Sequence, residues 1–131
     1  MTGLELARKF YESFDKDDIP SVLSCLADDI VWEMNGPPAL IPYFGTFRGK
    51  AEVERFFAKV FAEEEILQFA AEQFIDGGDS VAVVGREHCR AKSTGKDFSV
   101  RWTHVFDCRD GKIVRWREFI DTAPMAAAYQ R

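Results

Sequence analysis

Apolar residues recur at helical spacing in three segments of the first half of the chain. Between Leu4 and Phe14 they fall every three or four residues, which predicts an amphipathic helix. A shorter helix is predicted from Ile19, with Pro20 in its permissive first turn. A third stripe at the same spacing predicts a helix over residues 50–64. The first half of the chain is therefore expected to be mainly helical.

Alternating and β-branched residues dominate the second half and one earlier segment. They predict strands over Ile30–Met34, Ile66–Ile75, Ser80–Ala91, Asp97–Asp107 and Ile113–Asp121. Helices that precede a run of antiparallel strands are typical of the α+β class. The composition shows no linker or repeat, so we expect one domain over residues 1–131.

Residues 35–46 interrupt this pattern with several prolines and glycines, and cannot form a regular element. The segment nevertheless carries five large apolar side chains up to and including Phe47. An apolar loop of this length needs something to cover. Two interpretations remain open: a lid over a pocket, or a contact with a partner subunit.

The last two strands form a hairpin, because Asp110-Gly111 at the centre of the turn supplies the positive φ that a tight turn needs. The second strand ends at Asp121, and we expect Pro124 to stop it. An acidic side chain at the end of a core strand is an awkward place for a charge. We therefore predict that Asp121 faces a closed pocket; the alternative is that it caps a short helix over residues 124–129.

Composition and charge narrow the possible partners. The chain is 47% hydrophobic and 14% aromatic, with twelve Phe and three Trp, which suits a wide curved core or a stiff-walled cavity. Net charge is -5 and the basic residues are scattered, so nucleic acid is not an expected partner. No apolar run approaches the roughly 20 residues of a membrane span, and the N-terminus lacks signal-peptide features; we expect a cytoplasmic protein. Three cysteines without metal-ligand spacing predict free thiols and no metal site.

The long strands carry apolar residues on both faces. Trp116 and Ile120 share one face of the last strand, and Phe119 lies on the other. The helices can cover only one face of a sheet. We therefore predict a homodimer in which a second subunit packs on the other sheet face.

Two segments resemble a known family. Residues 106–121, with Asp110-Gly111-Lys112-Ile113-Val114 and Trp116-Arg117-Glu118-Phe119-Ile120-Asp121, resemble the end of SnoaL-like proteins, and residues 30–32 and 42–50 resemble their middle. That superfamily includes nuclear transport factor, ketosteroid isomerases, limonene epoxide hydrolases and polyketide cyclases. The resemblance implies a cone-shaped curved β-sheet wrapped around N-terminal helices, the cystatin-like α+β architecture, with an apolar cavity at one end. It implies no cofactor.

In the cyclases and epoxide hydrolases, the aspartate that matches Asp121 is the acid/base group. Its partner depends on which face of strand 97–107 lines the cavity. If Arg101, Thr103 and Val105 face inward, Arg101 could hold Asp121 ionised. If instead Trp102, His104 and Phe106 face inward, His104 could be a second proton carrier. His88 is a further candidate, but neither 86–88 nor 88–90 matches the Arg-x-Asp of the epoxide hydrolases, so epoxide hydrolysis is not expected.

We assign the cavity wall to apolar and small side chains of the strands, the loop and the third helix. The candidate substrate-binding residues are Trp32, Met34, Tyr43, Phe47, Phe57, Thr103 and Phe119. The expected ligand is a small apolar or polycyclic carbonyl compound, and the expected chemistry is isomerisation, ring closure or elimination by an aspartate general acid/base. The alternative is a non-catalytic module of the same fold that binds a hydrophobic ligand or partner.

Overall fold

The computed structural model describes all residues 1–131, as four helices and six strands. The helices are α1 (Gly3–Asp15), α2 (Ile19–Ser24), α3 (Lys50–Glu63) and α4 (Thr122–Tyr129). The strands are β1 (Leu26–Met34), β2 (Gly45–Arg48), β3 (Glu64–Asp76), β4 (Ser80–Ala91), β5 (Asp97–Arg109) and β6 (Lys112–Ile120). The expected helices and strands are present, and the α+β class is confirmed.

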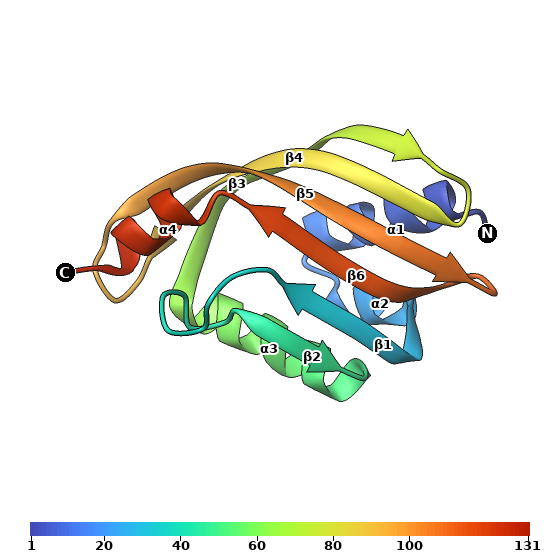
Figure 1. The fold of residues 1–131 in the computed structure, drawn as a ribbon, viewed down its shortest axis with the longest axis horizontal. Coiled ribbons are helices and arrows are strands. Elements are labelled where there is room, and N and C mark those ends of the chain that lie inside the picture. The colour runs from blue at the N-terminus through green and yellow to red at the C-terminus, as the bar shows by residue number, and fades with distance from the viewer.

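The strands form one mixed, curved and unclosed sheet in the order β2-β1-β6-β5-β4-β3 (Figure 1). Strands β3 to β6 form an antiparallel meander, and β1 joins β6 in parallel. The sequence prediction missed β2, whose four residues pair only with β1 and include a single large apolar side chain, Phe47. Such a short edge strand has too few residues to show alternation.

The β5–β6 hairpin has the predicted two-residue turn. Asp110 has φ 53° and Gly111 has φ 72°, which matches a turn with two left-handed residues. The turn pairs Arg109 with Lys112, and a bulge between Asp107 and Cys108 then shifts the register by one residue, so that His104 lies directly opposite Glu118. This register decides which side chains of the two strands share a face.

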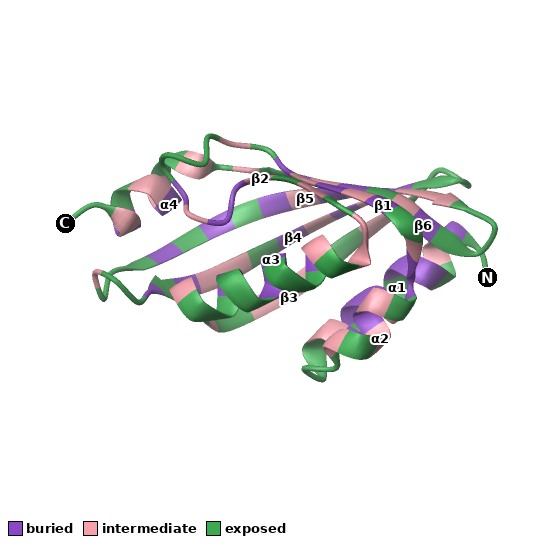
Figure 2. Cartoon of the chain, turned by 90° about the horizontal axis from the view of Figure 1, so that it is seen from below, coloured by how far each residue is buried: buried purple, intermediate pink, exposed green.

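Helices α1, α2 and α3 lie across the same face of the sheet (Figure 2). Their buried residues, including Phe10 of α1 and Val53 and Phe57 of α3, join the inward side chains of the strands in one core. No helix in the chain is long and apolar enough to span a bilayer. The outer sheet face carries half-buried and exposed residues, among them Phe119, which is 42% exposed.

Strand β6 ends before Pro124, and helix α4 begins two residues after the end of the strand. Pro124 lies in the first turn of α4, where its missing N–H costs nothing, and β6 has already ended at Ile120. The expectation that Pro124 stops the strand is therefore corrected. Thr94 donates a hydrogen bond to the Ala128 carbonyl and Lys96 donates to the Gln130 carbonyl, which dock α4 on the β4–β5 turn.

Candidate functional site

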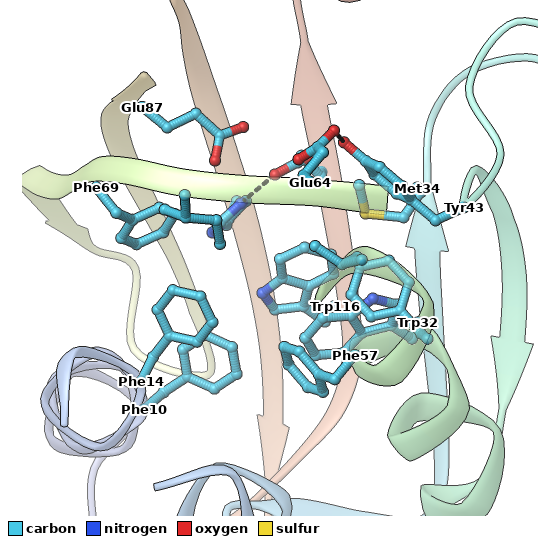
Figure 3. Close-up of a pocket in the computed structure, with 15 residues that line it drawn as sticks. Phe10, Phe14, Trp32, Met34, Tyr43, Phe57, Glu64, Phe69, Glu87 and Trp116 are labelled. Atoms are coloured by element: carbon cyan, nitrogen blue, oxygen red, sulfur yellow. Dashed lines mark hydrogen bonds and ion pairs between the residues drawn. The ribbon is translucent and has the colours of Figure 1, made fainter. Parts of the chain in front are cut away.

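A cavity of about 60 Å³ lies between the inner face of the sheet and helices α1 and α3 (Figure 3). Eleven of its fifteen lining residues are hydrophobic, and most of these are aromatic. The lining residues are Phe10, Phe14, Trp32, Met34, Tyr43, Phe56, Phe57, Val60, Glu64, Ile66, Phe69, Glu87, His104, Trp116 and Glu118. An apolar cavity with a few convergent polar groups is the usual form of a small-molecule site.

The cavity contains a buried chain of three polar side chains. His104 Nε2 lies 2.6 Å from Glu118 Oε2, and the Tyr11 hydroxyl oxygen lies 2.7 Å from His104 Nδ1. His104 is 3% exposed and Glu118 is 6% exposed. Both imidazole nitrogens are thus used within the protein, whereas no protein group hydrogen-bonds Glu118 Oε1. Of the polar atoms in this hydrogen-bonded series, Glu118 Oε1 is therefore the one that is free to bind a ligand.

Packing around His104 fixes the plane of its ring. Trp102 stacks on the imidazole with ring centroids 3.9 Å apart and an 11° interplanar angle. This arrangement requires Gly85 on the neighbouring strand, because a Cβ there would stand 2.2 Å from the Trp102 ring and 2.4 Å from the Ala70 carbonyl oxygen. The glycine in β4 therefore helps to hold the imidazole edge toward Glu118.

Burial controls the protonation of this pair. Loss of hydration raises the pKa of Glu118 to about 8 and holds the pKa of His104 well below its usual value. The imidazole is therefore neutral, and Glu118 exchanges between acid and carboxylate near neutral pH. Burial, and then the nearby Glu118, keep the pKa of Tyr11 well above its usual value. A carboxyl group that changes its charge at this pH is suited to acid/base work.

Two further acidic residues, Glu64 and Glu87, line the same cavity. The Tyr43 and Tyr129 hydroxyls both donate to Glu64 Oε1, the second across 2.7 Å. Burial raises the pKa of Glu64 to about 7, although the two tyrosine hydrogen bonds oppose the rise. Burial, followed by the charges of Glu118 and Glu64, raises the pKa of Glu87 well above its usual value. No lysine or arginine lines the cavity, so three carboxyl groups share it without a protein cation.

The structure places Asp121 outside this cavity, and the expected closed pocket around it is not found. Its side chain is exposed and accepts a hydrogen bond from the Ala123 N–H across 3.3 Å, as the N-cap of α4. The alternative role as a helix cap therefore describes its geometry. The expectation failed because β6 ends one residue before Asp121, so strand alternation no longer determines where its side chain points.

The register left open by the sequence brings His104 inward and leaves Arg101 outside. Trp102, His104 and Phe106 are buried, while Arg101 is exposed on the outer face. His88 also lies on the outer face, where it contacts Ser99 and Asp97. Neither Arg101 nor His88 can therefore reach a ligand in the cavity, and this part of the expected catalytic set is corrected.

The expected wall residues divide by the same alternation. Trp32, Met34, Tyr43 and Phe57 line the cavity. Phe47 does not line it but packs on Phe56, with ring centroids 5.2 Å apart. The remaining two, Thr103 and Phe119, pair with each other on adjacent strands on the sheet face that is turned away from the cavity, so their assignment to the cavity wall is corrected.

Sequence reasoning missed the acidic residues that the cavity does contain. Glu118 could have been found, because strand alternation places it between Trp116 and Ile120 on one face. In the sequence, Glu64 lies in a run of three acidic residues after the third helical stripe, which is typical of a solvated helix end, and Glu87 gives no local signal. Tyr11 falls on the apolar side of α1, a position that indicates packing only. The contacts that give these residues their chemistry are long-range.

The chain matches the model of the SnoaL-like domain over residues 7–116. The protein belongs to the SnoaL-like family. An NTF2-like protein from Burkholderia thailandensis is 31% identical, with 100% of this chain and 99% of that chain covered and a TM-score of 0.92. One from Burkholderia xenovorans is 30% identical over 99% and 98% of the two chains, with a TM-score of 0.87. TerC, crystallised with polyporic acid, is 28% identical over 95% of each chain, with a TM-score of 0.81.

These relatives confirm the expected NTF2-like architecture for this SnoaL-like protein. The same fold is found in a protein from Catenulispora acidiphila that is described as having a ketosteroid isomerase-like fold and is only 14% identical, with a TM-score of 0.79. Because the fold persists at such low identity, it does not determine the reaction. The chemistry has to be argued from the cavity residues of this chain.

Proposed function

We propose that this SnoaL-like protein is a cofactor-free enzyme that moves a proton on an apolar carbonyl compound, with Glu118 as the general acid/base. The observation that carries the proposal is the geometry of Glu118: it is 6% exposed, one oxygen is held 2.6 Å from His104, and the other has no protein partner. Desolvation places its pKa near the pH at which proton transfer is needed. The co-crystallisation of the relative TerC with polyporic acid supports a small organic ligand.

The reaction begins with ionised Glu118. Its free oxygen takes a proton from the carbon next to the substrate carbonyl, the C–H bond breaks, and its electron pair moves to give an enolate. Return of the proton from Glu118 to another carbon of the conjugated enolate completes an isomerisation. In a ring closure the enolate carbon attacks a second carbonyl, the C=O π electrons move to its oxygen, and that oxygen takes the proton back from Glu118. His104 keeps its hydrogen bond to the second oxygen of Glu118 throughout, and Tyr11 fixes the imidazole from behind. Both are positioning residues.

Cavity size selects the part of the substrate that reacts. The cavity volume of about 60 Å³ is smaller than the roughly 150 Å³ of an engineered apolar cavity that binds benzene, so a five- or six-membered ring would enter it with its carbonyl end only. A small carbonyl compound, or one reacting end of a larger one, fits this space. We therefore favour a compact substrate over a polycyclic compound that is buried whole.

Exchange of hydrogen for deuterium at the α-carbons of cyclopentanone tests the proposal, since it needs only enolate formation. We expect the wild type to accelerate exchange in D₂O, measured by proton NMR, with a rate that rises with pH to a plateau above about 8, the pKa of Glu118. Glu118→Gln should abolish the acceleration. Glu54→Gln, at an exposed position of α3, should leave it unchanged. No acceleration by the wild type, or full activity in Glu118→Gln, refutes the proposal.

A non-catalytic ligand-binding protein is the second candidate. It is favoured by one observation: both nitrogens of His104 are occupied within the protein, so the imidazole offers no second proton-transfer group. For this candidate, cyclopentanone perturbs cavity resonances in NMR spectra, and the α-carbon exchange stays at the rate of the buffer.

A further inference from the structure

The indole N–H of Trp116 is a buried donor with no partner in the protein. Trp116 is 3% exposed and lines the cavity, and its Nε1 makes no hydrogen bond. A buried donor without a partner has lost its hydrogen bond to water and gained none in return, so native proteins rarely keep one. In Figure 3 the indole nitrogen lies on the ring edge directed toward the side of the cavity where Phe10 and Phe14 stand. The Trp32 indole N–H, at the same cavity, is also buried without a partner, and of these two residues only Trp116 shares a strand with Glu118.

Trp116 and Glu118 stand side by side on β6. They are two residues apart with both side chains on the inner face, which separates their Cα atoms by about 7 Å. A molecule whose carbonyl oxygen accepts a hydrogen bond from the indole, across about 2.9 Å, therefore lies beside the strand position that carries Glu118. Trp32 stacks on the Trp116 ring at 3.7 Å and holds it in place.

We infer that the Trp116 N–H binds the carbonyl oxygen of the substrate and stabilises the enolate that forms when Glu118 takes the proton. This assignment rests on the proposed function of Glu118. As the C–H bond breaks, the proton neutralises Glu118 and the electron pair leaves a negative charge on the carbonyl oxygen. The indole N–H donates to that oxygen before and during the step, and its hydrogen bond strengthens as the charge develops.

The charges around the cavity explain why a neutral donor is needed. Glu64 and Glu87 lie in the same lining as Glu118, with no lysine or arginine among them. A cation at the enolate position would be drawn to these carboxyl groups and would lower their pKa values, including that of the base. An indole donor stabilises the oxygen without changing the charge of the site. Trp116 is in this sense a catalytic residue, since it touches the reacting group.

Indole NMR signals of the wild-type protein test the contact directly. The chain has three Trp, and Phe variants assign their three indole N–H signals. We expect cyclopentanone to move the Trp116 signal downfield, whereas methylenecyclopentane, which lacks the oxygen, leaves it nearly unmoved. The Trp102 indole, equally buried and unpaired but outside the cavity lining, should not respond. A ketone-dependent shift at Trp32 instead of Trp116, or no shift of any cavity signal, overturns the inference.

The Trp116→Phe variant separates this inference from the proposed function. Loss of the donor should lower the α-carbon exchange rate about 100-fold, as removal of an oxyanion donor does, while the pH midpoint set by Glu118 stays within about half a unit of wild type. Exchange that depends on Glu118 but is unaffected by Trp116→Phe overturns the role of Trp116 and leaves the proposed function standing. A ketone-dependent shift of the Trp116 signal without any catalysed exchange leaves the contact standing as a binding contact, and refutes both Glu118 catalysis and the enolate role of Trp116.

Discussion

Replacement of Glu118 by Gln should make the protein more stable at alkaline pH while it removes the proposed activity. In the native state burial raises the pKa of Glu118 from 4.5 to about 8, so the folded chain binds this proton more tightly than the unfolded chain. The free energy of unfolding then decreases as pH rises from about 4.5 to about 8 and levels off above that range. The pKa difference corresponds to about 5 kcal/mol at most, because the His104 hydrogen bond offsets part of the cost of the ionised form.

Urea unfolding, monitored by tryptophan fluorescence from pH 4 to pH 9, measures this pH-dependent part of the free energy of unfolding. Glu64 and Glu87 also lose protons in this range, so the informative quantity is the difference between variant and wild type at each pH. We expect Glu118→Gln to gain about 2–5 kcal/mol on wild type between pH 4.5 and pH 8, since Gln can keep a hydrogen bond to His104. The Glu54→Gln control should run parallel to wild type.

Parallel curves for Glu118→Gln and wild type would show that the native pKa of Glu118 is ordinary, and the basis of the acid/base assignment would be lost. A variant that is more stable and also inactive in the α-carbon exchange assay would show that the protein tolerates a destabilising buried acid for its chemistry.

The remaining predictions concern four other residues. Tyr11→Phe leaves the imidazole nitrogen that it contacts at 2.7 Å unpaired, and should cost about 1–3 kcal/mol in urea unfolding; no loss would mean that water replaces the hydroxyl. Glu64→Gln removes a group of native pKa about 7, and should cancel a fall of about 3 kcal/mol in unfolding free energy between pH 4.5 and pH 7. Phe119→Asp, on the outer sheet face, should convert the proposed homodimer to monomer in sedimentation experiments, and a monomeric wild type would refute that dimer. Asp121→Ala should cost about 1 kcal/mol as a lost helix cap without slowing exchange, whereas loss of exchange would restore Asp121 as the base.

Most of the helices and strands, the fold class and the family could be predicted from the sequence alone, whereas the short edge strand β2 could not. Helical spacing over residues 4–14 and 50–64 and alternation in β4 to β6 are local signals, because they depend on which side of one element meets the core. The Asp110-Gly111 turn is local in the same way, since it depends on the φ angles of two residues. Such local patterns can be recognised in one sequence, because they do not depend on which other elements pack against the segment.

Which acidic residue lies in the cavity depends on contacts that form only on folding. Asp121 and Glu118 are three residues apart near the end of β6. Alternation places Glu118 on the same face as Trp116, but it does not show which face meets the cavity. The pairing of β5 with β6 turns Glu118 toward His104 and the aromatic cavity, whereas the end of β6 at Ile120 releases Asp121 to cap α4. A perturbed pKa comes from desolvation by residues far away in the chain, such as Tyr11 and Trp32, and desolvation exists only after folding.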